Sequence, residues 1–149
     1  MTSPNAAVVL TQIATPDVAV AIAALAKMPI KVKGSAIGAY LLFDATEIAP
    51  EAVLRHFSGN IKDTLFIHLS YDDAFVKAES WRNGLLIEEL PAALVLDGTP
   101  HEIEDLVLGQ KSLNDLTDVL DARKLSRFKA SRILVKVARE AKKVVKDGK

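Results

Sequence analysis

The order of strand-like and helix-like segments over residues 6–71 limits the fold of this chain more than any other feature. Residues Ala6–Ala14 are apolar and include β-branched side chains, which is typical of a strand. Pro16 then marks a helix start, because its fixed φ angle suits the first helical turn. The helix is expected to end near Met28, since Pro29 disfavours a helical conformation in the residue before it.

The next segments continue this alternation. Ile30–Lys33 alternates apolar and charged residues like a half-exposed strand, and Gly34-Ser35 predicts a two-residue hairpin turn into a strand over Ala36–Phe43. A helix is predicted over Pro50–Phe57 and a strand over Thr64–Tyr71. The expected order is therefore strand, helix, strand, strand, helix, strand.

This order predicts an α/β protein of the α+β type. Two helices on one face of four strands would give a ferredoxin-like βαββαβ core with a mixed sheet, followed by a C-terminal helical extension. The prediction depends on the hairpin at Gly34-Ser35. If residues 30–44 instead form one irregular strand, the alternation predicts a doubly wound, mostly parallel sheet.

The segments between residues 73 and 98 have mixed signals. Asp73–Arg82 is predicted to be a helix that ends at Asn83-Gly84, and Leu85–Leu90 fits either a strand or a helix. The short apolar run Ala92–Leu96 predicts a strand. These elements would complete the core.

Three helix starts are predicted in the last third of the chain. Each has a side chain that can accept hydrogen bonds from free backbone N–H groups. Thr99 and Glu102 have the spacing of a capping box, and Ser112 and Asp115 repeat it with a shorter acid. Ser126 can cap the last helix.

Length and composition favour one soluble domain. Half of the 149 residues are apolar, enough for a substantial core. We expect a single domain with a core over about residues 6–98, a helical part over about 99–149 and a basic helix over about 126–147. The chain has no Cys, which excludes disulfides, thiol catalysis and thiolate metal sites. No apolar run approaches the ~20 residues of a membrane span, so a cytoplasmic protein is expected.

The net charge of zero conceals a strong asymmetry. Residues 1–121 carry eight Lys or Arg against 17 Asp or Glu, a net charge of −9. Residues 122–149 carry 11 Lys or Arg against two acids, a net charge of +9. An acidic body with a basic tail suggests a charged partner.

The basic tail has the periodicity of an amphipathic helix. Its predicted docking face is apolar and consists of Leu134, Val137, Ala141 and Val145. The opposite face carries the cations predicted to contact a phosphate or a protein partner: Lys129, Arg132, Lys136, Arg139, Lys142, Lys143 and Lys146.

The favoured interpretation of this helix is docking on protein, either its own chain or a second copy. Asp115, Asp118 and Asp121, at helical i, i+3 spacing, are one candidate acidic stripe for the cations. The chain would then be a non-enzymatic binding or assembly protein and a homo-oligomer. The alternative is a nucleic-acid-associated protein that binds phosphates through the helix, and a third possibility is an anionic membrane surface.

The sequence contains no phosphate-binding loop, dinucleotide fingerprint or nucleophile elbow. It therefore favours a protein that is not an enzyme and has no cofactor. His68, as a general base in mid-strand, is a weak catalytic candidate, as are Asp44 and Asp72 at predicted strand ends. With Asp97, these acids would meet at one edge of a parallel sheet and could hold Mg²⁺ in a small metal-dependent enzyme. In the ferredoxin-like arrangement Asp44 and Asp72 are expected at opposite ends of antiparallel strands, so no metal site is predicted.

Overall fold

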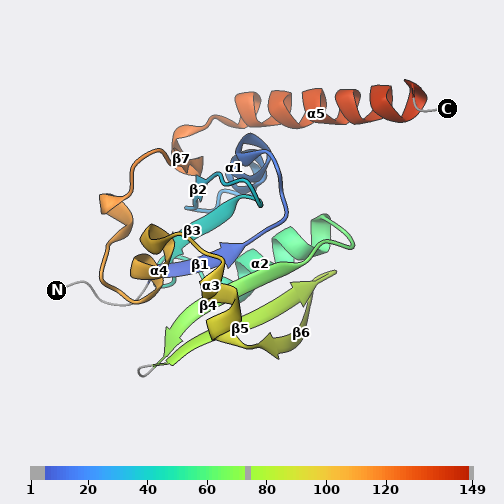
Figure 1. The fold of residues 1–149 in the computed structure, drawn as a ribbon. Coiled ribbons are helices and arrows are strands. Elements are labelled where there is room, and N and C mark those ends of the chain that lie inside the picture. The colour runs from blue at the N-terminus through green and yellow to red at the C-terminus, as the bar shows by residue number, and fades with distance from the viewer. Residues whose placement is uncertain (1–5, 73–74, 148–149) are drawn as a thin grey trace.

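The computed structural model describes residues 6–72 and 75–147, with the backbone alone described for Asp72 and residues 141–147. Seven strands form one sheet with the order β6-β5-β4-β1-β3-β2-β7 (Figure 1). The strands are β1 (Ala6–Leu10), β2 (Lys31–Lys33), β3 (Tyr40–Asp44), β4 (Phe66–Asp72), β5 (Phe75–Arg82), β6 (Leu85–Leu90) and β7 (Leu120–Asp121).

Every strand pair in the described sheet is antiparallel. This contradicts the doubly wound, mostly parallel alternative and corrects the predicted mixed sheet. The paired strands are antiparallel because each helical connection in the first half joins two strands that are not neighbours, so that another strand lies between them. β3 lies between β1 and β2, and β1 lies between β3 and β4.

The expected order of strands and helices is confirmed for residues 6–72. Helices α1 (Pro16–Leu25) and α2 (Pro50–Asn60) both begin at a proline, as predicted. α1 ends before the predicted Met28, because Lys27 has a positive φ of 58° and so cannot continue a right-handed helix. Local signals are therefore sufficient to place these two helices.

The connection between β2 and β3 differs from the predicted two-residue hairpin. A six-residue loop, 34–39, joins the two strands. Oγ of Ser35 accepts hydrogen bonds from the N–H groups of Ile37 and Gly38 at 3.2 and 3.1 Å, and donates to the carbonyl of Gly38 at 2.6 Å. A side chain thus replaces the backbone bonds of a tight turn, and β3 begins later than predicted.

Residues 75–82 form strand β5, not the predicted helix, and residues 75–81 pair with β4. Asn83 and Gly84, predicted to end a helix, have φ angles of 52° and 80° and form the turn into β6. Positive φ at both positions is characteristic of a tight β-hairpin. Cross-strand pairing, which a local helix pattern does not reveal, determines this part of the fold.

Residues Ala92–Asp97 form helix α3, not the predicted strand. A short apolar run has the same appearance in a buried strand and in a helix, so the pattern could not distinguish them. Helix α4 (His101–Val107) follows as predicted, but Thr99 does not cap it. Oγ1 of Thr99 donates instead to the carbonyl of Leu96 at 2.8 Å.

The two later caps are confirmed. Ser112 and Asp115 form a capping box, although it closes only the 3₁₀ turn η1 (Leu113–Asp115). A second 3₁₀ turn, η2 (Ala122–Lys124), precedes the last helix. The N–H of Lys129 donates to Oγ of Ser126 at 3.2 Å, at the start of α5 (Arg127–Asp147).

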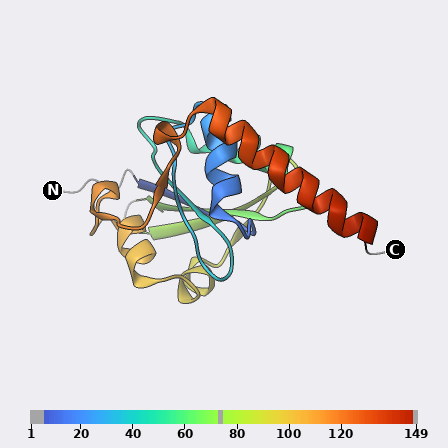
Figure 2. The same cartoon turned by 90° about the horizontal axis from the view of Figure 1, so that it is seen from above.

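Helices cover both faces of the sheet (Figures 1 and 2). On one face α1 and α2 bury a cluster that includes Phe43, Phe57 and Phe66. On the other face α4 buries Leu106 in a second cluster with Val8 and other strand residues, and α3 packs beside it. α5 packs on α1, at the outside of the first layer.

Candidate functional site

The first two turns of α5 attach it to the rest of the protein. Ala130 is fully buried, and Ile133 and Leu134 are partly buried against the core cluster that contains α1. The cap at Ser126 fixes where the helix begins. Leu134, a residue of the predicted docking face, thus contacts the body of its own chain, while the docking role of the face stays a prediction.

Beyond Leu134, α5 turns no described side chain into the core. Residues 135–140 are all exposed, including Val135 at 50% and Val137 at 36%. Figures 1 and 2 show the helix extending past the layered body. Val137 is therefore not buried against its own chain, and the side chains of Ala141 and Val145 lie outside the described residues.

The cations of α5 make no ion pair within the part of the chain whose side chains are described. Four of the predicted contact residues are exposed there: Lys129, Arg132, Lys136 and Arg139. The guanidinium of Arg132 lies 5.8 Å from the ring centre of Phe128, within cation–π range. The side chains of the other predicted cations, Lys142, Lys143 and Lys146, lie outside the described residues.

An open, shallow hollow of about 770 Å³ lies along this helix, and no other described element lines it. Its lining combines apolar and cationic side chains, with Phe128, Ile133 and Val135 beside Lys136 and Arg139. Phe128 is itself 72% exposed. Among the described helices, none is long and apolar enough to cross a membrane.

The acids predicted to face these cations do not form a helical stripe. The carboxylate of Asp115 accepts from the N–H of Ser112 at 3.0 Å, and that of Asp121 from the N–H of Arg123 at 2.9 Å. Asp118 lies in the loop between them with a φ of 57°. The three acids thus belong to a 3₁₀ turn, a loop and a strand, so the predicted helical stripe is wrong.

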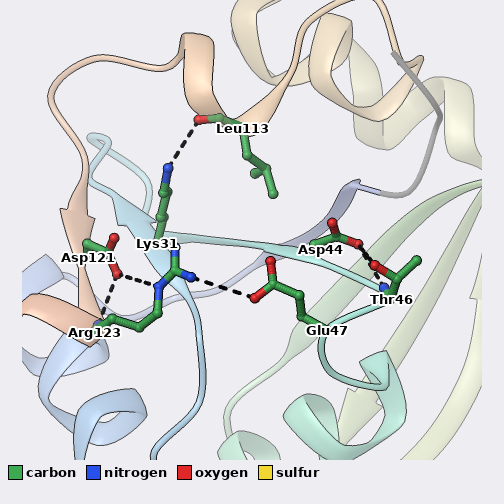
Figure 3. Close-up of polar contacts among 7 residues, drawn as sticks. All are labelled: Lys31, Asp44, Thr46, Glu47, Leu113, Asp121 and Arg123. Carbon is green, nitrogen blue, oxygen red and sulfur yellow. Dashed lines mark hydrogen bonds and ion pairs between the residues drawn. The ribbon is translucent and has the colours of Figure 1, made fainter. Parts of the chain in front are cut away.

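Asp44 borders a polar pocket of about 270 Å³ at the end of β3 (Figure 3). Nζ of Lys31 donates to the carbonyl of Leu113 at 3.4 Å, and the guanidinium of Arg123 lies 3.7 Å from the carboxylate of Glu47. These contacts connect β2 and the loop after β3 to η1 and η2. The pocket side chains therefore hold the C-terminal segment against the sheet.

The carboxylate of Asp44 has its own local partner. It accepts from the N–H and the hydroxyl of Thr46 at 2.8 and 2.6 Å. Both hydrogen bonds stabilise the ionised form, and they hold the pKa of Asp44 below its ordinary value. A carboxylate in this state ends a strand and orders a turn, which is not the environment of a catalytic acid.

The metal site considered from the sequence would also need Asp72 and Asp97, and the side chain of Asp72 lies outside the described residues. β3 and β4 both run antiparallel to β1. The backbones of Asp44 and Asp72 therefore lie at the same end of the strands, with β1 between β3 and β4. The prediction that Asp44 and Asp72 lie at opposite ends of antiparallel strands is therefore wrong. Asp97 ends helix α3 rather than a strand. Within the described residues, no group of three or more His, Asp or Glu side chains could hold a metal ion.

His68 occupies a more distinctive environment. It lies in mid-strand, as predicted, and is 8% exposed. Its Nδ1 is 3.7 Å from Oε1 of Glu79, its neighbour across the β4–β5 pair. Burial lowers the pKa of His68, and the negative charge of Glu79 only partly offsets this effect. His68 and Glu79 line one pocket of about 400 Å³ together with Trp81.

Sequence reasoning missed Glu79 and Trp81 because it assigned them to a helix. The signal was present, since Asn83-Gly84 is a strong hairpin signal and implies a strand on each side. In a strand, Glu79 and Trp81 share one face, and the pairing with β4 then places them beside His68.

The neutral state of His68 predicts a specific dependence of stability on pH. An unfolded His has a pKa of about 6.5, and the folded value is lower, so below about pH 6.5 the unfolded state binds more protons. The free energy of unfolding should therefore decrease on acidification from pH 7, by up to about 1.4 kcal/mol per pH unit. Urea unfolding of His68→Phe should lack this component, whereas His101→Gln, at an exposed position, should keep it. Equal pH profiles for the wild type and His68→Phe would show that His68 is not buried in its neutral form.

Comparison of the chain with known proteins found no relatives. No protein-family model, curated protein sequence or solved structure matches the chain. The chemistry of its surfaces and pockets is therefore the basis for a functional proposal.

Proposed function

We propose that this chain is a non-enzymatic assembly protein that docks helix α5 on the acidic body of a second copy. The observation that carries the proposal is the exposed stretch of α5 over residues 135–140, beside cations with no ion pair among the described side chains. A helix that contacts its own body through two turns and continues outward is suited to bind another molecule.

Charge favours a second copy as that molecule. Residues 1–121 carry a net charge of −9 and residues 122–149 a net charge of +9, so each copy offers both halves of a complementary pair. Pairing of two α5 helices would instead bring like charges together, which is unfavourable. Docking of α5 on the acidic body of the partner avoids this repulsion.

The same charges argue against nucleic acid as the main partner. The negative body repels phosphates, and Phe128 is the single aromatic side chain of residues 122–149 for base stacking. The alternative remains testable because phosphate binding has a characteristic salt dependence. The logarithm of the binding constant should fall with the logarithm of salt at about −0.9 per neutralised phosphate on duplex DNA.

We also propose that β1–β4 with α1 and α2 form a ferredoxin-like unit. Support comes from the spatial order β4-β1-β3-β2, in which both βαβ connections enclose a strand, and from the position of both helices on one face. In this interpretation β5, β6 and β7 extend the sheet at its two edges, and α3 and α4 cover the second face.

Charge reversal on α5 tests the proposed assembly. Lys136 and Arg139 are exposed, so changing both to Glu should leave the fold intact and convert the assembly to monomers in sedimentation velocity at low salt. A matched control, Lys27→Glu with Lys62→Glu, makes the same change in charge at exposed body positions and should stay associated at least as strongly as the wild type, because it makes the body more acidic. A monomeric wild type that binds a labelled DNA duplex through α5 would replace this proposal with the nucleic-acid alternative.

A further inference from the structure

The polar pocket at the end of β3 contains two charged side chains that have no partner of opposite charge. They are Lys31 on β2 and Asp44 on β3, and neither forms an ion pair with any described residue. Both residues line the pocket and keep part of their surface accessible to solvent. A molecule that enters the pocket can therefore reach both charges.

Each of the two charged groups also has free hydrogen-bonding capacity. The ammonium of Lys31 can donate three hydrogen bonds, and within the described residues it makes one, of 3.4 Å, to the carbonyl of Leu113. Both hydrogen bonds from Thr46 to Asp44 go to Oδ1, so Oδ2 accepts none from the described part of the chain. Because the bonds from Thr46 lower the pKa of Asp44, its carboxylate is ionised at neutral pH. The pocket thus offers one positive donor group and one negative acceptor atom.

Strand pairing places these two charges on one face of the sheet. Lys31 pairs with Leu42, and Asp44 lies two residues further along β3, so the three side chains point to the same side. In Figure 3 the side chain of Leu113 descends into the space between Lys31 and Asp44. Leu42 and Leu113 both line the pocket, so apolar surface lies between its positive and negative ends.

The remaining charges of the pocket limit what it can bind. Asp44 and Glu47 would repel a simple anion, whereas Lys31, together with the two other cations of the lining, would repel a simple cation. Those two cations, Lys111 and Arg123, are each held in an ion pair, of 3.5 and 3.7 Å. A ligand that carries both charges avoids both repulsions. The pocket volume of about 270 Å³ lies just below the range of about 300–1,000 Å³ that is usual for drug-sized ligands, so this ligand is small.

We propose that the pocket binds a small zwitterion, an α-amino acid with an apolar side chain. Its carboxylate accepts a hydrogen bond from Nζ of Lys31, and its ammonium donates one to Oδ2 of Asp44. Its side chain packs on Leu42 and Leu113. Each charge of the ligand then meets an opposite charge of the protein, and such charge-assisted hydrogen bonds are about twice as strong as those between neutral groups. The site uses no residue of α5 and goes beyond the proposed assembly.

Isothermal titration calorimetry of the full chain with alanine, valine and leucine at neutral pH tests the proposal. At least one of these amino acids should give a saturable heat. Two analogues of that amino acid then separate its charges, because the amide lacks the carboxylate and the deaminated acid lacks the ammonium. Each analogue should bind about tenfold more weakly than the amino acid, since each loses one charge-assisted hydrogen bond.

Two substitutions assign each charge of the ligand to its side chain. Lys31→Met keeps the apolar stem and should weaken binding of the amino acid and of the deaminated acid about tenfold, without an effect on the amide. Asp44→Asn keeps an oxygen for Thr46 and should weaken binding of the amino acid and of the amide, without an effect on the deaminated acid. Lys62→Met, at an exposed position outside the pocket, should bind all three compounds like the wild type.

The absence of a saturable heat with all three amino acids would overturn the proposal, as would equal affinities for an amino acid and both of its analogues. An equal loss of binding in Lys62→Met and Lys31→Met would also overturn it, because binding would then depend only on overall charge. The comparison of analogues uses the wild type alone, so it does not depend on the folding of a variant.

Discussion

Replacement of Gly38 by alanine is expected to destabilise the protein by about 3 kcal/mol, the upper end of the usual effect of overpacking. An ideal Cβ at this position would overlap the carbonyl oxygen of Thr11 and lie 2.9 Å from its carbon and 3.1 Å from Cα of Gln12. All three are backbone atoms, so no side-chain rotation can relieve the contact. The backbone itself would have to move.

Hydrogen bonds at this crossing make such a movement unfavourable. The N–H of Ala39 donates to the carbonyl of Ile13 at 2.8 Å, and the hydroxyl of Thr11 donates to the carbonyl of Ala39 at 2.7 Å. Displacement of Gly38 would lengthen both bonds. Urea unfolding analysed by linear extrapolation measures the loss.

Gly59→Ala is the matched control for this substitution. Gly59 lies in α2, and a Cβ there would meet only Cα of Gly84 at 3.8 Å, an ordinary contact. The control should be neutral or more stable by up to about 1 kcal/mol, because alanine favours the helix. Equal unfolding midpoints for Gly38→Ala and Gly59→Ala would contradict the close approach at Gly38.

Leu106→Ala is expected to cost about 2–5 kcal/mol, because it leaves a cavity where α4 meets the sheet. Leu106 is fully buried and belongs to the cluster that includes Leu42 and Leu69 from β3 and β4. Leu94→Ala on α3 removes the same atoms from a side chain that is 73% exposed, and should change stability by less than about 0.5 kcal/mol. If both variants unfold at the same urea concentration, α4 does not cover the second face.

The first half of the fold could be predicted because its signals are local and agree with one another. Pro16 and Pro50 begin helices, and apolar segments on either side of them form strands. The capping box at Ser112 and the cap at Ser126 were also predictable, since each depends on residues within one turn. None of these features requires knowledge of a distant contact.

The second half was predicted poorly because pairing across strands determines it. A helix start signal favoured a helix over residues 73–82, whereas seven paired positions with β4 make the described part of it a strand. The same error removed Glu79 and Trp81 from the set of candidate residues. His68 alone was found, because its place in mid-strand is visible in the local sequence.

The direction of α5 was also beyond sequence reasoning. Its periodicity predicts an apolar face but not how much of that face its own chain covers. The structure shows that Ala130, Ile133 and Leu134 pack against the body and that Val137 is exposed. Because part of α5 packs on its own body and part is exposed, the exposed part can dock on a second copy.

The molar mass of the full chain in solution tests that claim most directly. Light scattering at low salt should give a mass above the 16.1 kDa of one chain, increasing with protein concentration. Added salt should lower the mass towards 16.1 kDa, because it screens the attraction between α5 and the acidic body. A mass of 16.1 kDa at every concentration and salt level would contradict the account.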